Sequence, residues 1–259
     1  MRQRQHARRQ GHRPIRNAAH QVIQPILIGL GEIMQHIVCH RIFVAGVANA
    51  QPHAAEIGAK VLVDAVQAYG RVPVEVAADY IAISAHKCHG PKGIGALWIG
   101  PDASAPAPLL WGGGQEAGLR SGTLSPALCA GFGAAAQVAQ ESFSEQMFHV
   151  EHLWNIVREA FADWTLNGSA VDRWKGNLNI RKDGLDVARL MSDCRNVMFS
   201  AGSACASGSG RPSHVLRAIG LTDAQAKSSI RLGFGRYTNP EDIEAAAAII
   251  NAAAKEQGL

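Results

Sequence analysis

Short, continuous apolar runs alternate with longer helical patterns from about residue 54 onward. The runs Val61–Val63, Tyr80–Ile83 and Ile94–Ile99 predict strands, because apolar runs of this length suit a sheet that is covered on both faces. Three later runs predict further strands at Leu178–Ile180, Val197–Ser200 and Ile230–Phe234. Strands that alternate with helices in this way predict an α/β fold.

The segments between these runs predict helices. Leu124–Ser142 is mostly Ala, Gly, Leu and Val, which indicates a buried helix, and Gln146–Trp164 has an amphipathic pattern. Shorter helices are expected at Leu185–Cys194 and Pro212–Ile219. A capping box formed by Thr238 and Glu241 predicts the start of the last helix. Its apolar positions keep a helical spacing at Ile243, Ala246, Ala247, Ile250 and Ala254.

Residues 1–50 differ in composition from the rest of the chain. They contain seven arginines, five of the eleven histidines, no lysine and one acidic residue, Glu32. A basic disordered arm and a segment translated in the wrong frame are both open interpretations. We therefore expect an anomalous segment over 1–50, then one α/β unit over 51–140 and a second over 141–259.

The overall composition is that of a soluble globular protein, with 47% apolar and 18% charged residues and a net charge of only +4. A charge this small does not indicate nucleic-acid binding. No apolar run reaches the roughly 20 residues of a membrane span. The five cysteines are scattered, with no disulfide framework and no CxxC metal motif, so we expect a reducing cytoplasm and no metal site.

A lysine lies just past the second predicted strand, within Ser84-Ala85-His86-Lys87-Cys88-His89-Gly90-Pro91-Lys92-Gly93. Taken alone, this segment is most simply a surface loop with solvated lysines. A lysine among polar residues at a strand end can also form a Schiff base with an aldehyde, provided that its amine is neutral. Because open α/β sheets bind ligands at strand ends, Lys87 is a candidate for covalent cofactor binding.

Small and polar residues surround Cys205 on both sides, from Ser200 to Gly210. Most free cysteines are small buried hydrophobic residues, and we interpret Cys129 and Cys194 in this way. A segment as small and polar as the one around Cys205 is expected to be accessible. Because the thiolate is the nucleophilic form of cysteine, Cys205 is a candidate nucleophile once it loses its proton.

Three segments together resemble the cysteine desulfurases of the class V aminotransferase group: Asp64-Ala65-Val66-Gln67, the lysine segment and the Cys205 segment. Members of this family are pyridoxal-phosphate enzymes of fold type I. The resemblance covers about residues 54–257 and fails over 1–50. It implies part of the large cofactor domain over 51–140 and the smaller C-terminal domain over 141–259. The phosphate-binding and ring-stacking groups that the family has upstream of Asp64 are not found in this sequence.

The resemblance implies a role for each residue of the cofactor site. Lys87 would hold pyridoxal 5′-phosphate covalently, and Asp64 would pair with the protonated pyridine nitrogen of the cofactor. Gln67 would hydrogen-bond the phenolic oxygen of the ring. Ser84 and His86 would donate to the phosphate, and His86 is also a candidate for proton transfer.

Further segments complete the resemblance. In Gly112–Thr123, it implies that Thr123 reaches the phosphate of the partner subunit and that Arg120 supports this junction. In Ser228–Gly233, it implies that Arg231 binds the substrate carboxylate, because a guanidinium offers two parallel donors. Asn177 would lie near the substrate.

The function that the resemblance implies is removal of sulfur from L-cysteine. Cys205 would attack the substrate sulfur, L-alanine would be released, and the persulfide left on Cys205 would pass to a sulfur-acceptor protein in iron–sulfur cluster assembly or thiolation. The resemblance implies a homodimer, while the cysteine pattern, hydropathy and charge predict a cytoplasmic protein that binds neither nucleic acid nor membrane. A selenocysteine lyase is a close variant, and a truncated, inactive homologue is a second possibility. Nucleic-acid binding by the arginine-rich start is a third, although that segment lacks interleaved aromatic residues.

Overall fold

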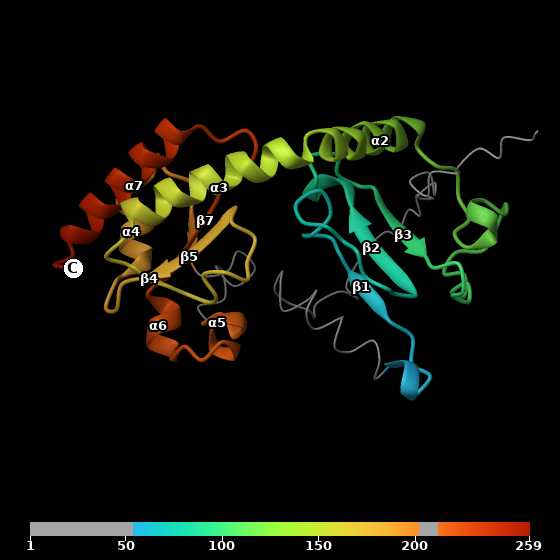
Figure 1. Ribbon diagram of the computed structural model, residues 1–259, viewed down its shortest axis with the longest axis horizontal. Coiled ribbons are helices and arrows are strands. Elements are labelled where there is room, and N and C mark those ends of the chain that lie inside the picture. The colour runs from blue at the N-terminus through green and yellow to red at the C-terminus, as the bar shows by residue number, and fades with distance from the viewer. Residues whose placement is uncertain (1–53, 202–211) are drawn as a thin grey trace, which may run out of the picture.

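The computed structural model describes residues 54–201 and 212–259, which form two sheets with separate hydrophobic cores (Figure 1). The first sheet has the order β1-β2-β3 and contains β1 (Leu62–Asp64), β2 (Tyr80–Ser84) and β3 (Gly95–Ile99). β1 runs parallel to β2, and β3 runs antiparallel to β2. With the helix that follows it, this sheet makes the part of the molecule that we call the β1–β3 unit.

The second sheet has the order β4-β5-β7-β6, and its neighbouring strands are all antiparallel. Its strands are β4 (Thr165–Leu166), β5 (Asn177–Arg181), β6 (Ser200–Ala201) and β7 (Ser229–Gly233). Residues Leu178 and Ile180 of β5 are completely buried and alternate with polar residues. One face of this sheet therefore packs on a core and the other is polar. We call this part of the molecule, from Phe143 onward, the β4–β7 unit.

Helices cover one face of each sheet. The structure contains α2 (Pro126–Glu141), α3 (Phe143–Ala160), α4 (Val187–Asp193), α5 (His214–Ala218), α6 (Asp223–Lys227) and α7 (Pro240–Lys255), with short 3-10 turns η1 (Ala85–Lys87) and η2 (Glu116–Gly118). Phe132 of α2 packs in the first core, whereas α3, α4 and α7 contribute to the second. Figure 1 shows α2 and α3 following one another along one side of the molecule, so these helices join the two units.

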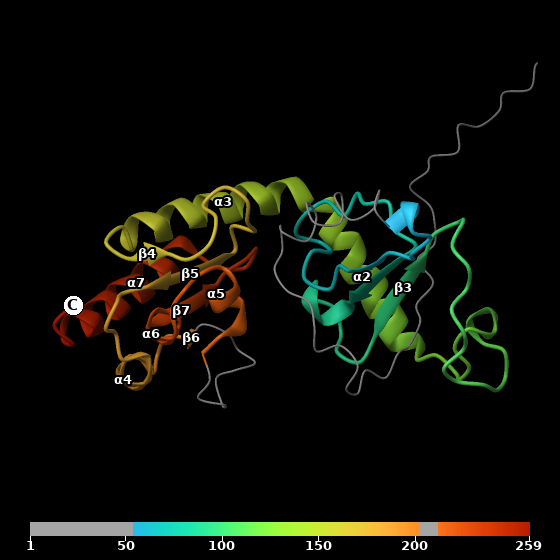
Figure 2. The same cartoon turned by 90° about the horizontal axis from the view of Figure 1, so that it is seen from below.

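The two units also meet through polar and aromatic contacts near the start of α3. Gln146 Nε2 donates to the carbonyl oxygen of Gly70 over 2.9 Å. The ring of Tyr237 lies edge-on to that of His89, with 5.2 Å between centroids. In the view turned by 90°, the two units are again connected by α2 and α3 (Figure 2). The loop after β1 and the turn after η1, both in the first unit, therefore contact α3 and the loop after β7 in the second unit.

The α/β prediction is confirmed, but several predicted elements are wrong in detail. The chain turns after α4, where the Val197 N–H donates to the Cys194 carbonyl oxygen, so β6 begins only at Ser200 and not at Val197. The predicted helix Gln146–Trp164 begins earlier, at Phe143, and ends at Ala160. Two short elements, β4 and α6, were not predicted.

The predicted capping box at the last helix is also wrong. Asn239 is the N-cap of α7 and Pro240 is its first residue, while the Thr238 hydroxyl oxygen accepts from the Gly235 N–H in the preceding turn. A capping box does occur at α6, where Thr222 and Gln225 satisfy each other's backbone N–H groups. Among the described residues, no helix combines the length and apolarity needed to cross a bilayer.

Candidate functional site

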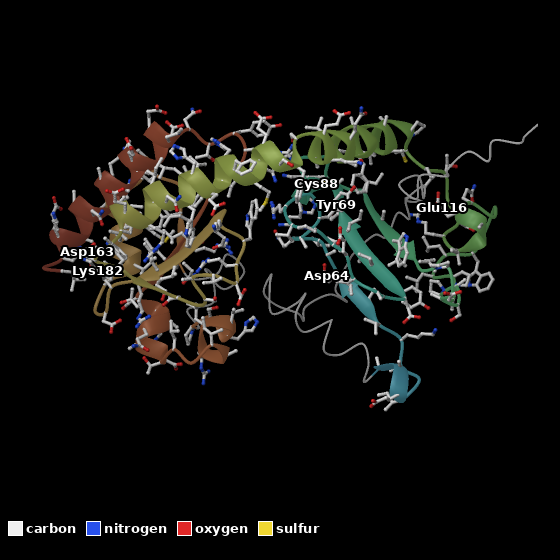
Figure 3. The ribbon with its side chains drawn as sticks, viewed as in Figure 1. Asp64, Tyr69, Cys88, Glu116, Asp163 and Lys182 are labelled. Carbon is white, nitrogen blue, oxygen red and sulfur yellow. The ribbon has the colours of Figure 1, made fainter. Side chains whose placement is uncertain are left out.

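The predicted cofactor residues lie where two parallel strands end. Asp64 is the last residue of β1 and Ser84 is the last residue of β2, and β1 and β2 are parallel. Their carboxyl ends therefore lie at the same edge of the sheet, and η1 places Lys87 directly after this edge. Figure 3 shows Asp64 on the side of the β1–β3 unit that is nearer to the β4–β7 unit.

Asp64 has one anchored oxygen and one available oxygen. Its Oδ1 accepts from the backbone N–H of Val66 over 2.9 Å, and the side chain is half-buried. Its Oδ2 has no hydrogen-bond partner among the described residues. The carboxylate is thus held in place by the turn that follows β1, and it keeps an acceptor for an external N–H group.

The lysine segment brings a hydroxyl, an imidazole and an amine together. Ser84 Oγ lies 2.9 Å from His86 Nδ1, and the tautomer of the ring decides which of the two atoms donates. Within the described ranges, Lys87 Nζ makes no hydrogen bond or ion pair. Gly90 closes the turn by donating to the Ala85 carbonyl oxygen, and a Cβ there would lie only 3.0 Å from that oxygen. The backbone therefore fixes this segment while its lysine amine remains available.

Gln67 lies in a tight turn after β1, where Arg71 holds it. Arg71 Nη1 donates to Gln67 Oε1 over 2.6 Å and to the main-chain oxygen of Gln67 over 3.3 Å. Arg71 is half-buried, and burial lowers its guanidinium pKa. The sequence reading missed Arg71, although its position four residues after Gln67 is the spacing at which side chains meet in a helical turn.

The cysteines of the described residues differ in burial. Cys88 is buried and its thiol donates to the Ala85 carbonyl oxygen over 3.2 Å, and burial raises its pKa. Burial also raises the pKa of Cys194, as expected for a core residue. Cys129 was predicted to be buried as well, but it is only half-buried on α2. The candidate nucleophile Cys205 lies outside the described residues.

The substrate candidates Arg231 and Asn177 lie on the polar face of the second sheet. Arg231 of β7 pairs with Asn179 of β5 on one side and with Ser200 of β6 on the other. Asn177 is two positions from Asn179, so its side chain lies on the same face as that of Arg231. β6 leads directly into the segment that carries Cys205, so the sheet places the start of this segment beside Arg231.

Thr123 belongs to the loop that precedes α2. Thr123 is exposed, and Gly122 just before it donates to Gln115 Oε1 over 3.0 Å. Glu116 and Ala117 both have positive φ angles, of 52° and 54°, which non-glycine residues adopt rarely. Burial raises the pKa of the Glu116 carboxyl. Figure 3 shows Glu116 on the side of the unit away from Asp64 and Cys88.

A metal centre would be an alternative to the predicted cofactor site. No group of three or more His, Cys, Asp or Glu side chains in the described part of the chain is arranged to hold a metal ion.

Arg120, a predicted support for Thr123, donates to the Ser121 carbonyl oxygen over 3.2 Å. Arg120 therefore braces the loop that carries Thr123.

Comparison with protein families matches residues 37–246 to the family Aminotransferase class-V. The mitochondrial cysteine desulfurase of Saccharomyces cerevisiae is 42% identical over 188 residues, which cover 70% of this chain and 38% of that protein. Cysteine desulfurase IscS of Rickettsia typhi is 40% identical over 195 residues, covering 72% of this chain and 48% of that protein. The chain thus spans less than half of the length of these curated relatives.

Solved structures agree with this assignment. A NifS-like protein from Rickettsia africae superposes with a TM-score of 0.71 at 27% identity, over 81% of this chain and 57% of that chain. SspA in complex with cysteine superposes with a TM-score of 0.56 at 32% identity, over 74% of this chain and 55% of that chain. The predicted fold-type I architecture is therefore confirmed over part of its length. The chain belongs to the class V aminotransferase family, as a homologue of the cysteine desulfurases.

Proposed function

We propose that this protein is a pyridoxal-phosphate-dependent cysteine desulfurase, with Lys87 as the cofactor lysine and Cys205 as the sulfur acceptor. The observation that carries the proposal is the convergence of Asp64, Ser84 and Lys87 at one edge of the first sheet. In this proposal the β1–β3 unit is the remaining part of the large cofactor domain, and the β4–β7 unit is the small domain.

The side chains at this edge fit the chemical groups of pyridoxal phosphate. The open oxygen of Asp64 can accept from a ring N–H, and a carboxylate there keeps the pyridine nitrogen protonated. Ser84 and His86 supply donors suited to a phosphate. Lys87 supplies an amine that no described residue engages. When bound, the cofactor would withdraw electrons from the substrate and so weaken its bonds near the amino group.

Cys205 would take the substrate sulfur. Its thiolate attacks that sulfur, a sulfur–sulfur bond forms, the carbon–sulfur bond of the substrate breaks, and a proton reaches the carbon so that L-alanine leaves. Cys88 and Cys194 are poorly suited to this attack, because burial raises their pKa and keeps them protonated. The placement of Arg231 beside the strand that leads to Cys205 supports the same assignment.

The remaining residues would orient substrate and cofactor. Arg231 would bind the substrate carboxylate through two parallel N–H donors, with Asn177 on the same sheet face nearby. His86, linked to Ser84, would move a proton near the lysine. Thr123, which is exposed, would contact the phosphate held by a second copy of the chain, so the proposal includes a homodimer. The sulfur on Cys205 would then pass to an acceptor protein.

The test uses the full chain incubated with pyridoxal phosphate, followed by removal of the free cofactor. We expect a visible absorption band that is lost in Lys87→Ala, and sulfide or persulfide formation from L-cysteine that is lost in Cys205→Ser while the band remains. Lys92→Ala, a second lysine in the same segment, is the matched control and should keep both signals. A wild-type chain that stays colourless in excess cofactor would refute the proposal and favour an inactive homologue.

A further inference from the structure

We propose that Arg71 is a positioning residue for the cofactor site: its guanidinium fixes the side-chain amide of Gln67 so that the amide N–H group, and not the amide oxygen, faces the cofactor ring. This inference rests on the proposed function, and it adds a residue to which the sequence reading gave no role.

The contact between the two side chains is short and involves one end of the amide. Arg71 Nη1 lies 2.6 Å from Gln67 Oε1 and also donates to the main-chain oxygen of Gln67. Consecutive hydrogen-bonded turns hold the backbone here: the Tyr69 N–H donates to the Ala65 carbonyl oxygen and the Arg71 N–H to the Ala68 carbonyl oxygen, each over 2.9 Å. Gln67 Nε2 has no hydrogen-bond partner among the described residues. The Arg71 guanidinium therefore occupies the acceptor end of the amide and leaves its donor end available.

A glutamine amide can present either an oxygen or an N–H group, and only its surroundings decide between them. A guanidinium carries five N–H donors and no acceptor, so it can engage only the oxygen. A phenolic oxygen that carries negative charge requires a donor opposite it. Arg71 therefore selects the amide orientation that can serve such an oxygen, before any cofactor arrives.

The surroundings of Arg71 argue against a purely structural role. Arginine is seldom buried unless it is paired with an acid, yet no carboxylate in the described ranges forms a salt bridge with the half-buried Arg71. Burial lowers its pKa, Cys88 raises it by a smaller amount, and the positive charge of Arg236 from the other unit lowers it further. Among the described residues, Arg71 donates hydrogen bonds to Gln67. The orientation of the Gln67 amide therefore explains why a cation is present in this half-buried position.

The experiment measures the pH midpoint of the visible band of the cofactor-loaded full chain. This band would report the protonation of the covalent link that Lys87 would make to the cofactor aldehyde, whose proton would be shared with the phenolic oxygen. A donor at that oxygen weakens the sharing, so losing the donor should raise the midpoint. We expect Gln67→Ala and Arg71→Met each to raise it by about one pH unit, the effect of one hydrogen bond to a charged group. The double variant should rise no further, and Arg71→Lys should restore most of the wild-type value.

Arg181→Met is the matched control, because Arg181 Nη1 also donates to a side-chain amide oxygen, that of Asn167, over 2.8 Å in the other unit. Its midpoint should equal that of the wild type. If Gln67→Ala shifts the midpoint and Arg71→Met does not, or if the two shifts add in the double variant, the inference is wrong while the proposed function stands.

A colourless wild-type chain would overturn the proposed function, and with it the cofactor role of both residues. The side-chain amide resonances of Gln67 in the cofactor-free chain then separate the two failures. If these resonances move in Arg71→Met and return in Arg71→Lys, the contact exists and only the cofactor assignment has failed. If they do not move, the positioning contact itself is refuted.

Discussion

The two sheets differ in how they are packed and in what they carry. In the β4–β7 unit, large side chains such as Phe161, Leu178 and Ile230 are completely buried. In the β1–β3 unit, the completely buried side chains are small, namely Val63, Ala65 and Ala85. The proposed cofactor residues nevertheless lie mainly in this thinly packed unit.

This difference shows that the two halves of the proposed site are held by different forces. Arg231 owes its position to an antiparallel sheet whose other face is anchored in a core. The residues after β1 and β2 owe theirs to hydrogen bonds, such as that of Val66 to Asp64 and that of Arg71 to Gln67. Packing changes should therefore affect the second unit most, and polar changes should affect the cofactor edge.

The largest effect is expected from Ile230→Ala in the core of the second unit. Ile230 is completely buried, and replacing such a residue by alanine lowers the free energy of unfolding by about 2–5 kcal/mol. Val63→Ala, in the core of the first unit, removes two methyl groups and should lower it by about 1.5 kcal/mol. Chemical denaturation measures both values. Val138→Ala, at a position 45% exposed on α2, should stay within about 0.5 kcal/mol of the wild type. Equal losses at Ile230 and Val63 would contradict the contrast between the cores.

Arg231→Ala should have the next largest effect, on substrate binding instead of folding. Hydrogen bonds to a charged group contribute about 1.5–3 kcal/mol, so the KM for L-cysteine should rise by about 10-fold to 150-fold. Arg231→Lys should recover part of this loss, since lysine keeps the charge but not the paired donors. Arg189→Ala, at a salt-bridged site on α4, is the control and should leave KM unchanged. An unchanged KM in Arg231→Ala would show that the polar sheet face does not bind the substrate carboxylate.

Hydrophobic pattern was enough to predict the fold class but not every boundary. Tyr80–Ile83 is a compact apolar run, and β2 lies there. Val197 and Phe199 are apolar too, but they lie in the connection between α4 and β6, which begins with a turn. Local apolarity cannot distinguish such a connection from a strand. The five-residue helix α6 is too short for periodicity, although its Thr222–Gln225 capping box was visible in the sequence.

The sequence could indicate which candidate residues lie close together only where one motif holds a residue and its neighbours. The contact between Ser84 and His86 lies within one short segment, whereas the pairing of Arg231 with Ser200 joins strands far apart in the chain. Arg71 was missed because its role depends on a helical turn that no periodic pattern marks. Side-chain contacts of this kind depend on backbone geometry, which residue types alone do not specify.

The smallest predicted effect concerns a surface ion pair of the second unit, between Asp163 Oδ2 and Lys182 Nζ, 2.8 Å apart. The hydrogen bond from Lys182 holds the pKa of the Asp163 carboxyl below its ordinary value of 3.8. A carboxyl with a lowered pKa in the folded state stabilises it above the unfolded-state pKa, and this contribution is lost as the pH falls through the folded-state pKa. Because the Asp163 side chain is 63% exposed, water screens the pair, and Asp163→Asn should lower the free energy of unfolding by less than about 1 kcal/mol at pH 7.

Denaturation of the wild type and Asp163→Asn at pH 7 and at pH values well below 3.8 measures this contribution and its sign. The two curves should differ slightly at pH 7 and coincide once the carboxyl is protonated. Lys182→Gln and the double variant complete a cycle that separates the pair from the contact of Lys182 with the Trp164 ring, which lies 5.7 Å from its Nζ. A coupling energy above about 2 kcal/mol would show that charge contributes to this unit on the scale of a core side chain, and it would remove the contrast between a unit held by packing and an edge held by polar contacts. A difference that persists in acid would instead show that the effect of Asp163→Asn does not come from the charge of the carboxylate.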